Sequence, residues 1–482
     1  MKTIVNIIHP ALALIALACF GLASTANAAC QDACLTNSNT VQGDDALISL
    51  TSGIQNTAMG FQALANNTTG ENNTAVGDRA LLNNDTASGN TAIGVVALYS
   101  NTTGQGNVAV GVNALWQNTT GHENTATGGA ALSNNTTGID NTATGAAALS
   151  NNTTGDGNTA TGRDALFSNT IGISNTADGR AALFSNTDGV FNTANGDNAL
   201  FSNTEGSGNT ATGYRALVSN TTGLSNTATG TGALQNNVTS NENTATGYLA
   251  LGSRNGDHNT ATGAYALLFS TGNSNIAVGW NAGANLTTAS NNIDIGNNGV
   301  AAESNTIRIG TTGTQTATYM AGIYGMTVAK SAGVFIDANG RLGTKSSSQR
   351  FKDDIKPMDK ASEAIHALKP VTFRYKKEID AEQTPQFGLV AEDVEKVNPD
   401  LVLRGTDGKV HTVRYEAVNA MLLNEFLKEH RKVQLLEASA TEQQKEIKAL
   451  KAELKEQRAF IQMVNDKVEL NRAAPKTVSN NR

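Results

Sequence analysis

The sequence predicts a mostly β protein: a repetitive parallel β-solenoid (β-roll) stalk, then a small α+β domain and a C-terminal trimeric coiled coil. Three observations predict this fold class. A 17-residue repeat fills most of the first 310 residues, no proline occurs between Pro10 and Pro357, and an apolar residue recurs every seventh position near the C-terminus. Such repeats are typical of stacked coils, a proline-free run suits a ladder that needs every N–H, and the heptad indicates a coiled coil.

Composition disfavours several other classes of protein. With 482 residues the chain is too long for one ordinary core, so several domains are expected. Aromatic residues make up only 5% of it and glycine accounts for 48 residues, which argues against a large conventional core. The net charge of −7 disfavours nucleic acid as a partner, because phosphate binding needs a basic surface. No phosphate-binding loop, dinucleotide fingerprint or hydrolase triad is recognisable, and we expect no cofactor.

The N-terminus indicates a secretory signal peptide over residues 1–28. Lys2 supplies the positive charge, residues 7–22 are mostly apolar, and residues 26–28 form a small-x-small cleavage site. The apolar run is short for a membrane span, although a retained anchor is the alternative. After cleavage Cys30 and Cys34 remain, and an oxidising export route makes them a disulfide candidate, within one chain or between chains.

The repeat is defined by the pattern Asn-Thr-Ala-x-Gly. It recurs every 17 residues from Asn39 to Asn243, and then at steps of 16 at Asn259 and Asn275. The fifth position is Gly in all fifteen regular copies, and the eighth and ninth are Ala-Leu in fourteen of them. Composition alone, rich in Asn, Thr, Gly and Ala, could indicate disorder. The strict period argues against disorder.

Each copy is expected to form one coil. Strand alternation turns Ala and Gly, at the third and fifth positions, to one face and the second and fourth positions to the other. Asn and Gly supply the positive φ of tight corners, and stacking places Asn over Asn and Thr over Thr. At about 25 cal/mol per Å², the few apolar groups of each coil make a weak core for one chain. We therefore expect three rods to associate and bury the Leu row between them.

Two resemblances concern the repeat. Asn-Thr-Ala-x-Gly resembles the Asn-Ser-Val-Ala-Ile-Gly head repeats of trimeric autotransporter adhesins, which are trimers of parallel β-rolls with a shorter period. The Thr-Ala-Thr segments resemble ice-binding faces, although Asp178 and Asn195 interrupt them. They begin at Thr125, Thr142, Thr159, Thr210, Thr227, Thr244 and Thr260.

Composition changes near Lys345, where lysine and charge return after a gap that begins at Lys2 and ends at Lys330. Just before this change, residues 334–344 indicate a β-hairpin around Asn339-Gly340, a strong turn pair. A separate domain is therefore expected to follow the stalk.

Four motifs then follow in a fixed order. They are SSSQRFKDDI at 346–355, PVTFRY at 370–375, QFGLVAEDV at 386–394 and VRY at 413–415. Together with the hairpin they resemble the intramolecular chaperone domain of phage tail spikes, endosialidases and related fibres, over about residues 334–470. The resemblance implies a domain that trimerises, templates the folding of the preceding fibre and releases itself by self-cleavage.

The resemblance also implies a catalytic dyad of a serine and a lysine five residues later, here Ser347 and Lys352. A serine hydroxyl is a poor nucleophile until a base accepts its proton, and a lysine whose pKa is lowered by burial can be that base. We expect cleavage between Ser346 and Ser347. Only the spacing to Lys352 selects Ser347 among three consecutive serines. The alternative is a linker serine beside a solvated surface lysine.

The final helix carries seven heptads. The a positions are Phe426, Val433, Ala440, Ile447, Leu454, Ile461 and Val468, and the d positions are Leu422, Glu429, Leu436, Gln443, Leu450, Gln457 and Val464. An apolar a seam of this length indicates a coiled coil. The alternative is a long solvated helix folded back on its own domain. The histidines His366, His411 and His430 are too scattered for a metal site.

These inferences combine into one hypothesis: an exported homotrimeric surface fibre, resembling an adhesin, with a possible host-surface or glycan receptor. Its only chemistry would be a single-turnover Ser-Lys self-cleavage. The alternative is an ice-binding or matrix protein whose trimerisation domain does not cleave. The expected segments are a signal peptide (1–28), an N-terminal segment (29–38), the stalk (39–310), a β connector (311–345), the chaperone domain (346–415), the coiled coil (416–471) and a disordered tail (472–482).

Overall fold

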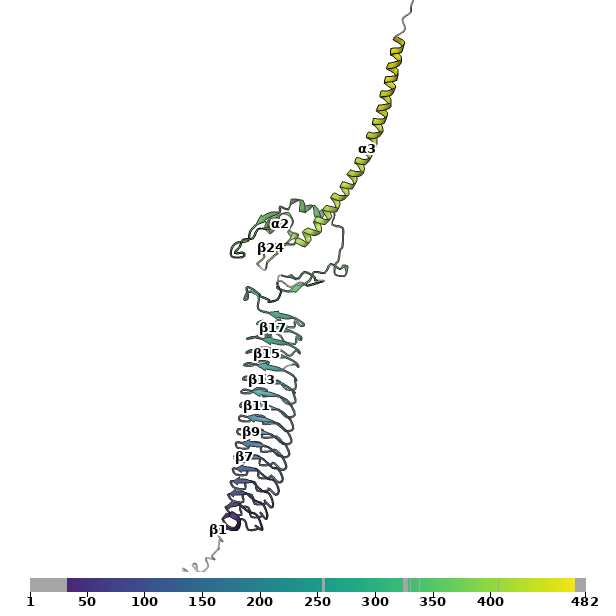
Figure 1. The fold of residues 1–482 in the computed structure, drawn as a ribbon. Helices are drawn as coiled ribbons and strands as arrows, with labels where there is room; N and C mark the ends of the chain where they lie inside the picture. Colours follow the sequence, from purple (N-terminus) through teal and green to yellow (C-terminus); the bar gives the residue numbers. More distant parts are fainter. Residues whose placement is uncertain are drawn as a thin grey trace, which may run out of the picture. The chain divides into compact units, whose positions relative to one another are not determined.

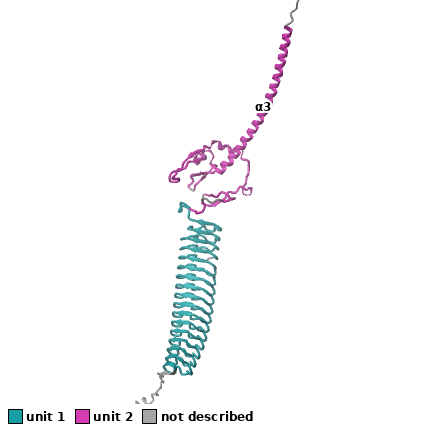
Figure 2. Cartoon of the chain, viewed as in Figure 1, with its two compact units in different colours: residues 1–318 teal, residues 319–482 magenta. Residues whose placement is uncertain are grey.

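The structure is a computed structural model that describes residues 33–253, 256–323, 328–329, 331–337, 339–405 and 407–472, with side chains from residue 37 onward. The chain divides into two compact units, residues 1–318 and 319–482 (Figure 2). The predicted signal peptide and Cys30 lie outside the described residues, as do residues 473–482 of the expected tail.

Unit 1 is a parallel β-solenoid in which each coil contributes one short strand to a continuous sheet (Figure 1). The sheet has 18 strands across the described residues, and only β1 (Ala33–Leu35) is antiparallel, pairing with β2 at the N-terminal end. A short 3-10 turn, η1 (Thr36–Ser38), joins these two strands. The predicted solenoid is confirmed.

The parallel strands follow the repeat. They are β2 (Asn39–Gln42), β3 (Thr57–Met59), β4 (Thr74–Val76), β5 (Thr91–Ile93), β6 (Val108–Val110), β7 (Thr125–Thr127), β8 (Thr142–Thr144), β9 (Thr159–Thr161), β10 (Thr176–Asp178), β11 (Thr193–Asn195), β12 (Thr210–Thr212), β13 (Thr227–Thr229), β14 (Thr244–Thr246), β15 (Thr260–Thr262), β16 (Ile276–Val278), β17 (Ile293–Ile295) and β18 (Ile307–Ile309). Their register places equivalent residues beside one another, as Thr125 beside Thr142 and Ala126 beside Ala143.

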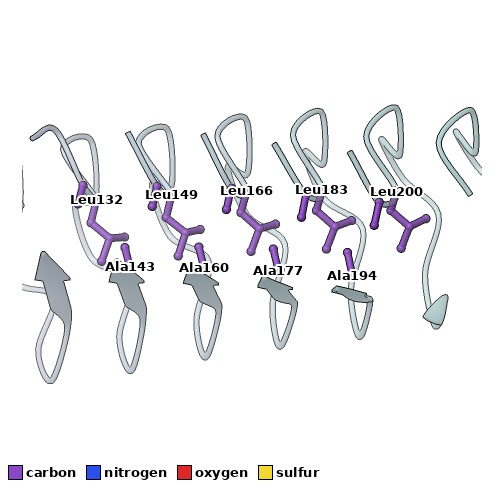
Figure 3. Packing of buried hydrophobic residues seen from close by; sticks show 14 of the residues in the cluster. Leu132, Ala143, Leu149, Ala160, Leu166, Ala177, Leu183, Ala194 and Leu200 are labelled. Atoms are coloured by element: carbon purple, nitrogen blue, oxygen red, sulfur yellow. The ribbon is translucent and has the colours of Figure 1, made fainter. Parts of the chain in front are cut away.

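The interior of the solenoid is built from Ala and Leu. In the third position Ala points inward, and the Ala-Leu pair at positions eight and nine faces it from across the coil (Figure 3). Ala160 and Leu166, for example, are both 0% exposed. The expectation that the Leu row is buried between three rods is therefore wrong. Each leucine adopts a left-handed backbone, with φ near 50° at Leu166, which turns its side chain into its own coil.

Two buried ladders of asparagine run through the coils. In the first, the Asn124 backbone N–H donates to Asn107 Oδ1 at 3.0 Å, and Asn124 Nδ2 donates to the same oxygen and to the Gly138 carbonyl. In the second, Asn118 Nδ2 donates to Asn101 Oδ1 and to the Gly121 carbonyl, both at 2.9 Å. A buried amide left unbonded is costly, and here each coil supplies the partners for the next. The expected stacking of Asn over Asn is confirmed.

The fifth position requires glycine for two reasons, its own positive φ and the closeness of the neighbouring coil. Gly128 has φ +134°, and a Cβ built on it would lie 2.5 Å from the Gly145 carbonyl oxygen. An L-residue is strained at that φ and cannot fit so close to the next backbone. This explains the absence of any other residue at this position in the regular copies.

Unit 2 begins with the predicted hairpin, β19 (Phe335–Ile336) paired antiparallel with β20 (Leu342–Gly343). Short elements follow. They are η2 (Gln349–Phe351), η3 (Asp359–Ala367), β21 (Val371–Phe373), β22 (Gln386–Gly388), α2 (Ala391–Val397), η4 (Pro399–Leu401), β23 (Val402–Arg404) and β24 (Val410–Val413). The strands pair as β21 with β22 and β23 with β24.

The last element of unit 2 is α3 (Tyr415–Arg472), a single 58-residue helix (Figure 1). Its first turns pack on η3 and help bury a small core of Val394, Leu401, Val402, Val413 and Met421. All residues from 429 to 472 are exposed in the single chain. This part of the helix therefore has no partner within the described residues of its own chain.

Candidate self-cleavage site

The candidate dyad lies on the two sides of one 3-10 turn. Ser347 precedes η2 and Lys352 follows it directly. The turn is closed by the Phe351 N–H, which donates to the Ser348 carbonyl at 3.1 Å, and by the Lys352 N–H, which donates to the Gln349 carbonyl at 3.0 Å. Lys352 Nζ donates to Ser347 Oγ at 3.1 Å. The five-residue spacing thus becomes a direct contact between the two side chains.

The structure distinguishes Ser347 from the serines beside it. Ser346 Oγ accepts a hydrogen bond from the Ser348 N–H at 3.3 Å, so it is engaged by the local backbone. Ser348 occupies the N-cap position of η2 without a side-chain capping bond. Of the three hydroxyls, only that of Ser347 is within hydrogen-bond distance of a described lysine ammonium.

Solvent access is high around the dyad. Ser347 and Lys352 are both exposed, and Phe351 between them is 64% exposed. The Arg350 guanidinium lies 4.6 Å from the Phe351 ring centroid, a cation–π contact. The single chain therefore holds the two side chains of the candidate dyad together but does not exclude water from them.

Lys345 links the segment just before the dyad to other parts of unit 2. Its Nζ forms an ion pair with Glu416 in the first turn of α3 and lies 4.7 Å from the Phe335 ring centroid in β19. The hydrogen bond from Lys345 lowers the pKa of Glu416 below its ordinary value. The backbone that carries Ser346 and Ser347 is thus tethered at the start of the long helix.

Residues 347–403 match the model of the family described as chaperone of endosialidase. This segment of unit 2 is similar to that family. The match begins at Ser347, the candidate nucleophile, and a long β-solenoid precedes it. No curated protein and no solved structure matches the chain. The likeness of the stalk to adhesin head repeats remains a resemblance of sequence pattern.

Sequence reasoning missed a second polar cluster in unit 2. Glu425 of α3 is 7% exposed and accepts hydrogen bonds from Ser362 of η3 and, at 2.6 Å, from Lys428 Nζ. His366 Nε2 lies 3.0 Å from its other oxygen, and Asn424 Nδ2 donates to Ser362 Oγ at 2.7 Å. The hydrogen bond from Lys428 and then that from Ser362 lower the pKa of Glu425 to about 2.

This cluster fixes η3 on α3, and nothing in the sequence identifies it. Glu425 occupies a g position of the heptad, where a charged residue is ordinary. Ser362 is 63 residues away along the chain. Only the packing of two distant helices brings them together.

The remaining site predicted from the sequence is the disulfide candidate. The pairing of Cys30 with Cys34 cannot be followed, because Cys30 and the side chain of Cys34 lie outside the described residues. Among the residues that the structure describes, no group of three or more His, Cys, Asp or Glu side chains could hold a metal ion. Within the same residues, no helix is long and apolar enough to cross a membrane.

Proposed function

We propose that this protein is an exported homotrimeric surface fibre whose chaperone domain trimerises the chain, assists folding of the stalk and releases itself by Ser-Lys autoproteolysis. The observation that carries the proposal is the 3.1 Å contact between Lys352 Nζ and Ser347 Oγ at the first residue of the chaperone-family match. Export rests on the signal-like sequence of residues 1–28.

Cleavage requires the proton to move toward the lysine. Neutral Lys352 Nζ accepts the proton of the Ser347 hydroxyl, and Oγ adds to the carbonyl carbon of Ser346. The peptide C–N bond breaks, the Ser347 nitrogen takes up the proton from Lys352, and an ester to Oγ remains. Water then hydrolyses the ester and separates the stalk from unit 2.

Assembly is a natural trigger for this chemistry. Burial favours the neutral form of a lysine, and both members of the dyad are exposed in the single chain. Packing of neighbouring chains around η2 would supply the missing burial. Cleavage would then follow trimerisation, so that the domain is released only from an assembled fibre.

Trimerisation is supported by the surface of α3. Its heptad seam is exposed in the single chain, with Ile447, Leu450 and Leu454 at 51%, 61% and 52% exposed. Exposed apolar rows at heptad spacing are stabilised by association into a coiled coil. The small core of the chaperone domain gives it a second reason to gain stability from partners.

The decisive experiment is the intact and native mass of the purified protein and its Ser347→Ala and Lys352→Ala variants. Ser348→Ala and Lys356→Ala serve as controls, since they change the same residue types nearby. We expect a cut between Ser346 and Ser347 and a trimeric stalk in the wild type and both controls, and an uncut trimer in the two dyad variants. A cut that persists in Ser347→Ala contradicts the dyad, and an uncut trimer throughout reduces the domain to a permanent trimerisation module.

Adhesion to a host surface or glycan receptor is the proposed role of the stalk. It is tested by comparing binding of the full chain and a chain without residues 39–310 to cells and glycan panels. Equal binding by the two proteins removes the adhesive role.

The alternative, an ice-binding or matrix protein, is favoured by one feature of the stalk. Threonines at the second and fourth positions stack in register from β7 to β9 and from β12 to β15. Thermal hysteresis of the purified stalk would support this function. Its absence would exclude it.

A further inference from the structure

The outward face of the solenoid changes character in its last coils. From β7 to β15 the second and fourth positions carry Thr, apart from Asp178 and Asn195. In β16, β17 and β18 these positions carry only β-branched apolar residues. They form two rows in register, Ile276, Ile293 and Ile307 in one and Val278, Ile295 and Ile309 in the other. Ile293 is partly exposed, and the other five side chains are exposed by 40% to 67%.

On the inward face of the same strands, charged residues replace the apolar Ala. The third position, Ala from β3 to β16, becomes Asp294 in β17 and Arg308 in β18. Asp294 is 2% exposed, and its Oδ2 has no hydrogen-bond partner among the described residues. Arg308 pairs with Glu303 through two hydrogen bonds of 2.7 and 2.8 Å. Strands normally alternate so that the apolar face is covered, yet here the apolar face points away from the coil's own interior.

We propose that the apolar face formed by the outward rows of β16, β17 and β18 is the contact through which copies of this chain hold their stalks together. The face bears no charge, because Arg308 lies on the opposite side of its strand and is neutralised by Glu303. Identical copies can therefore meet on it without repulsion. Contiguous exposed apolar patches of this kind mark association surfaces.

A second copy is the occupant that the chain itself supplies. β18 ends at Ile309, ten residues before unit 2 begins at Tyr319. Ten extended residues span at most about 36 Å, so each last coil stays close to the start of its own unit 2. Assembly of unit 2 from several chains would therefore raise the local concentration of these coils. The inference rests on the trimer of the proposed function at this point.

Self-cleavage makes such a contact necessary. A cut between Ser346 and Ser347 removes α3, and with it the coiled coil, from the stalk. A stalk that remains trimeric after the cut needs a contact of its own. The first coils carry one apolar row at the fourth position, with Met59, Val76, Ile93 and Val110. Their second position is Thr except at Val108, and Ala stays inward.

Cysteine cross-linking in the full chain tests this contact. Ile295→Cys and, as a matched control, Thr161→Cys occupy the same fourth position of their coils and are both exposed. Both are made in a background with Cys30→Ser, Cys34→Ser and Ser347→Ala, so that α3 stays attached. After mild oxidation we expect Ile295→Cys to form disulfide-linked chains at least tenfold more than Thr161→Cys.

Native mass separates the possible failures. A trimer in which Ile295→Cys gives no interchain disulfide overturns this inference and leaves the proposed function intact, whether the face is then open or covered by the chain's own connector. A monomer overturns the trimer itself. Equal cross-linking at Thr161→Cys overturns the restriction to the last coils, because it would place the whole face in the interface.

A second test uses the chain with Ser347 intact. The double variant Ile295→Thr and Ile309→Thr gives the last coils the Thr that the middle coils carry at the fourth position. We expect the uncut protein to remain trimeric and the released stalk to fall to a monomer. A released double-variant stalk that stays trimeric also contradicts the proposal.

Discussion

Two adjacent glycines in one coil have very different surroundings. Gly128 has φ +134° and faces the Gly145 carbonyl, whereas a Cβ on Gly129 would meet nothing within 4 Å. The same substitution at the two positions therefore separates the effect of stacking from the general effect of losing a glycine. This makes the pair a sensitive test of how tightly the coils are packed.

We predict that Gly128→Ala destabilises the coils on both sides by about 1–3 kcal/mol, the usual cost of a residue held in a disfavoured backbone conformation. Gly129→Ala should be neutral or stabilising by up to about 1 kcal/mol. Hydrogen exchange of amides near residues 110–145 measures both effects. Equal protection in the two variants would show that the coils are not packed as described.

Asp294 gives the last coils a pH dependence of a definite sign. Burial raises the pKa of Asp294 to about 6, against the opposing effect of Arg308 and with a smaller contribution from Glu303. The folded-state pKa is above that of an unfolded Asp, about 3.9. Its contribution to stability is therefore complete below pH 4 and is lost as the pH rises through 6.

We predict that these coils are less stable at pH 7.5 than at pH 4.5, by on the order of 2 kcal/mol. Asp294→Asn should remove this difference, whereas Asp178→Asn on the outward face should keep it. Exchange protection of residues 276–309, corrected for intrinsic rates, is the measurement. An unchanged pH dependence in Asp294→Asn would assign the effect to another group.

Single residues were predicted from the sequence with mixed success, for physical reasons. The inward Ala, the corner Gly and the Asn ladders follow from periodicity, because each repeats the same local problem. The Leu row was placed on the wrong side, since nothing in the pattern reveals that Leu166 and its equivalents take a positive φ. The catalytic roles of Ser347 and Lys352 stay a prediction, although their spacing does bring the side chains into contact.

Among the elements, α3 is the one whose stability depends most on contacts with other helices. From residue 429 onward it is exposed along its full length, and its apolar residues follow the heptad predicted from the sequence. In proteins most helical stability comes from packing of an apolar face. The helix should therefore be well ordered only when its seam is covered.

We predict that Ile447→Asp or Leu450→Asp converts the proposed trimer to a monomer and lowers the helical ellipticity at 222 nm. Each places a charge on the seam of every chain. Lys448→Asp, at an outward b position between them, should leave the native mass unchanged. A trimer that survives Ile447→Asp and Leu450→Asp would show that α3 is not the trimerisation element.

Elements that depend on residues adjacent in sequence were predicted better than contacts between residues far apart in sequence. The strands and the hairpin at Asn339-Gly340 were found because their turn residues and alternation are adjacent in sequence. The packing of η3 on α3 around Glu425 was not, because it joins residues about sixty positions apart. The heptad pattern predicted the helix over residues 415–472. The pattern alone does not identify which other helices pack against it.

At the scale of the whole molecule, the stalk is a stack of nearly equivalent units. Each coil contacts its two neighbours, so its stability is a sum of coil and interface contributions. Removing one whole period should then shorten the stalk without disturbing its folding. Removing part of a period should break both asparagine ladders at one place.

We predict that deletion of residues 141–157 leaves the oligomeric state, the proposed self-cleavage and the β character of the stalk unchanged, because Asn158 takes the place of Asn141 on the ladder. Deletion of residues 141–149 should produce a misfolded or protease-sensitive stalk. Circular dichroism and limited proteolysis distinguish the two. Equal behaviour of the two deletions would contradict a period-by-period architecture.

The uniformity of the coils also creates an ambiguity that the folding chain has to resolve. A segment misaligned by 17 residues still finds Asn over Asn and Gly over Gly, so the middle of the stalk carries almost no information about which coil belongs where. The ends differ most: β1 runs antiparallel to β2 at one end, and β17 and β18 reverse their polarity pattern at the other. The two ends of the array therefore set the register in which the coils stack. Folding that begins at either end would avoid a shift of register by one coil.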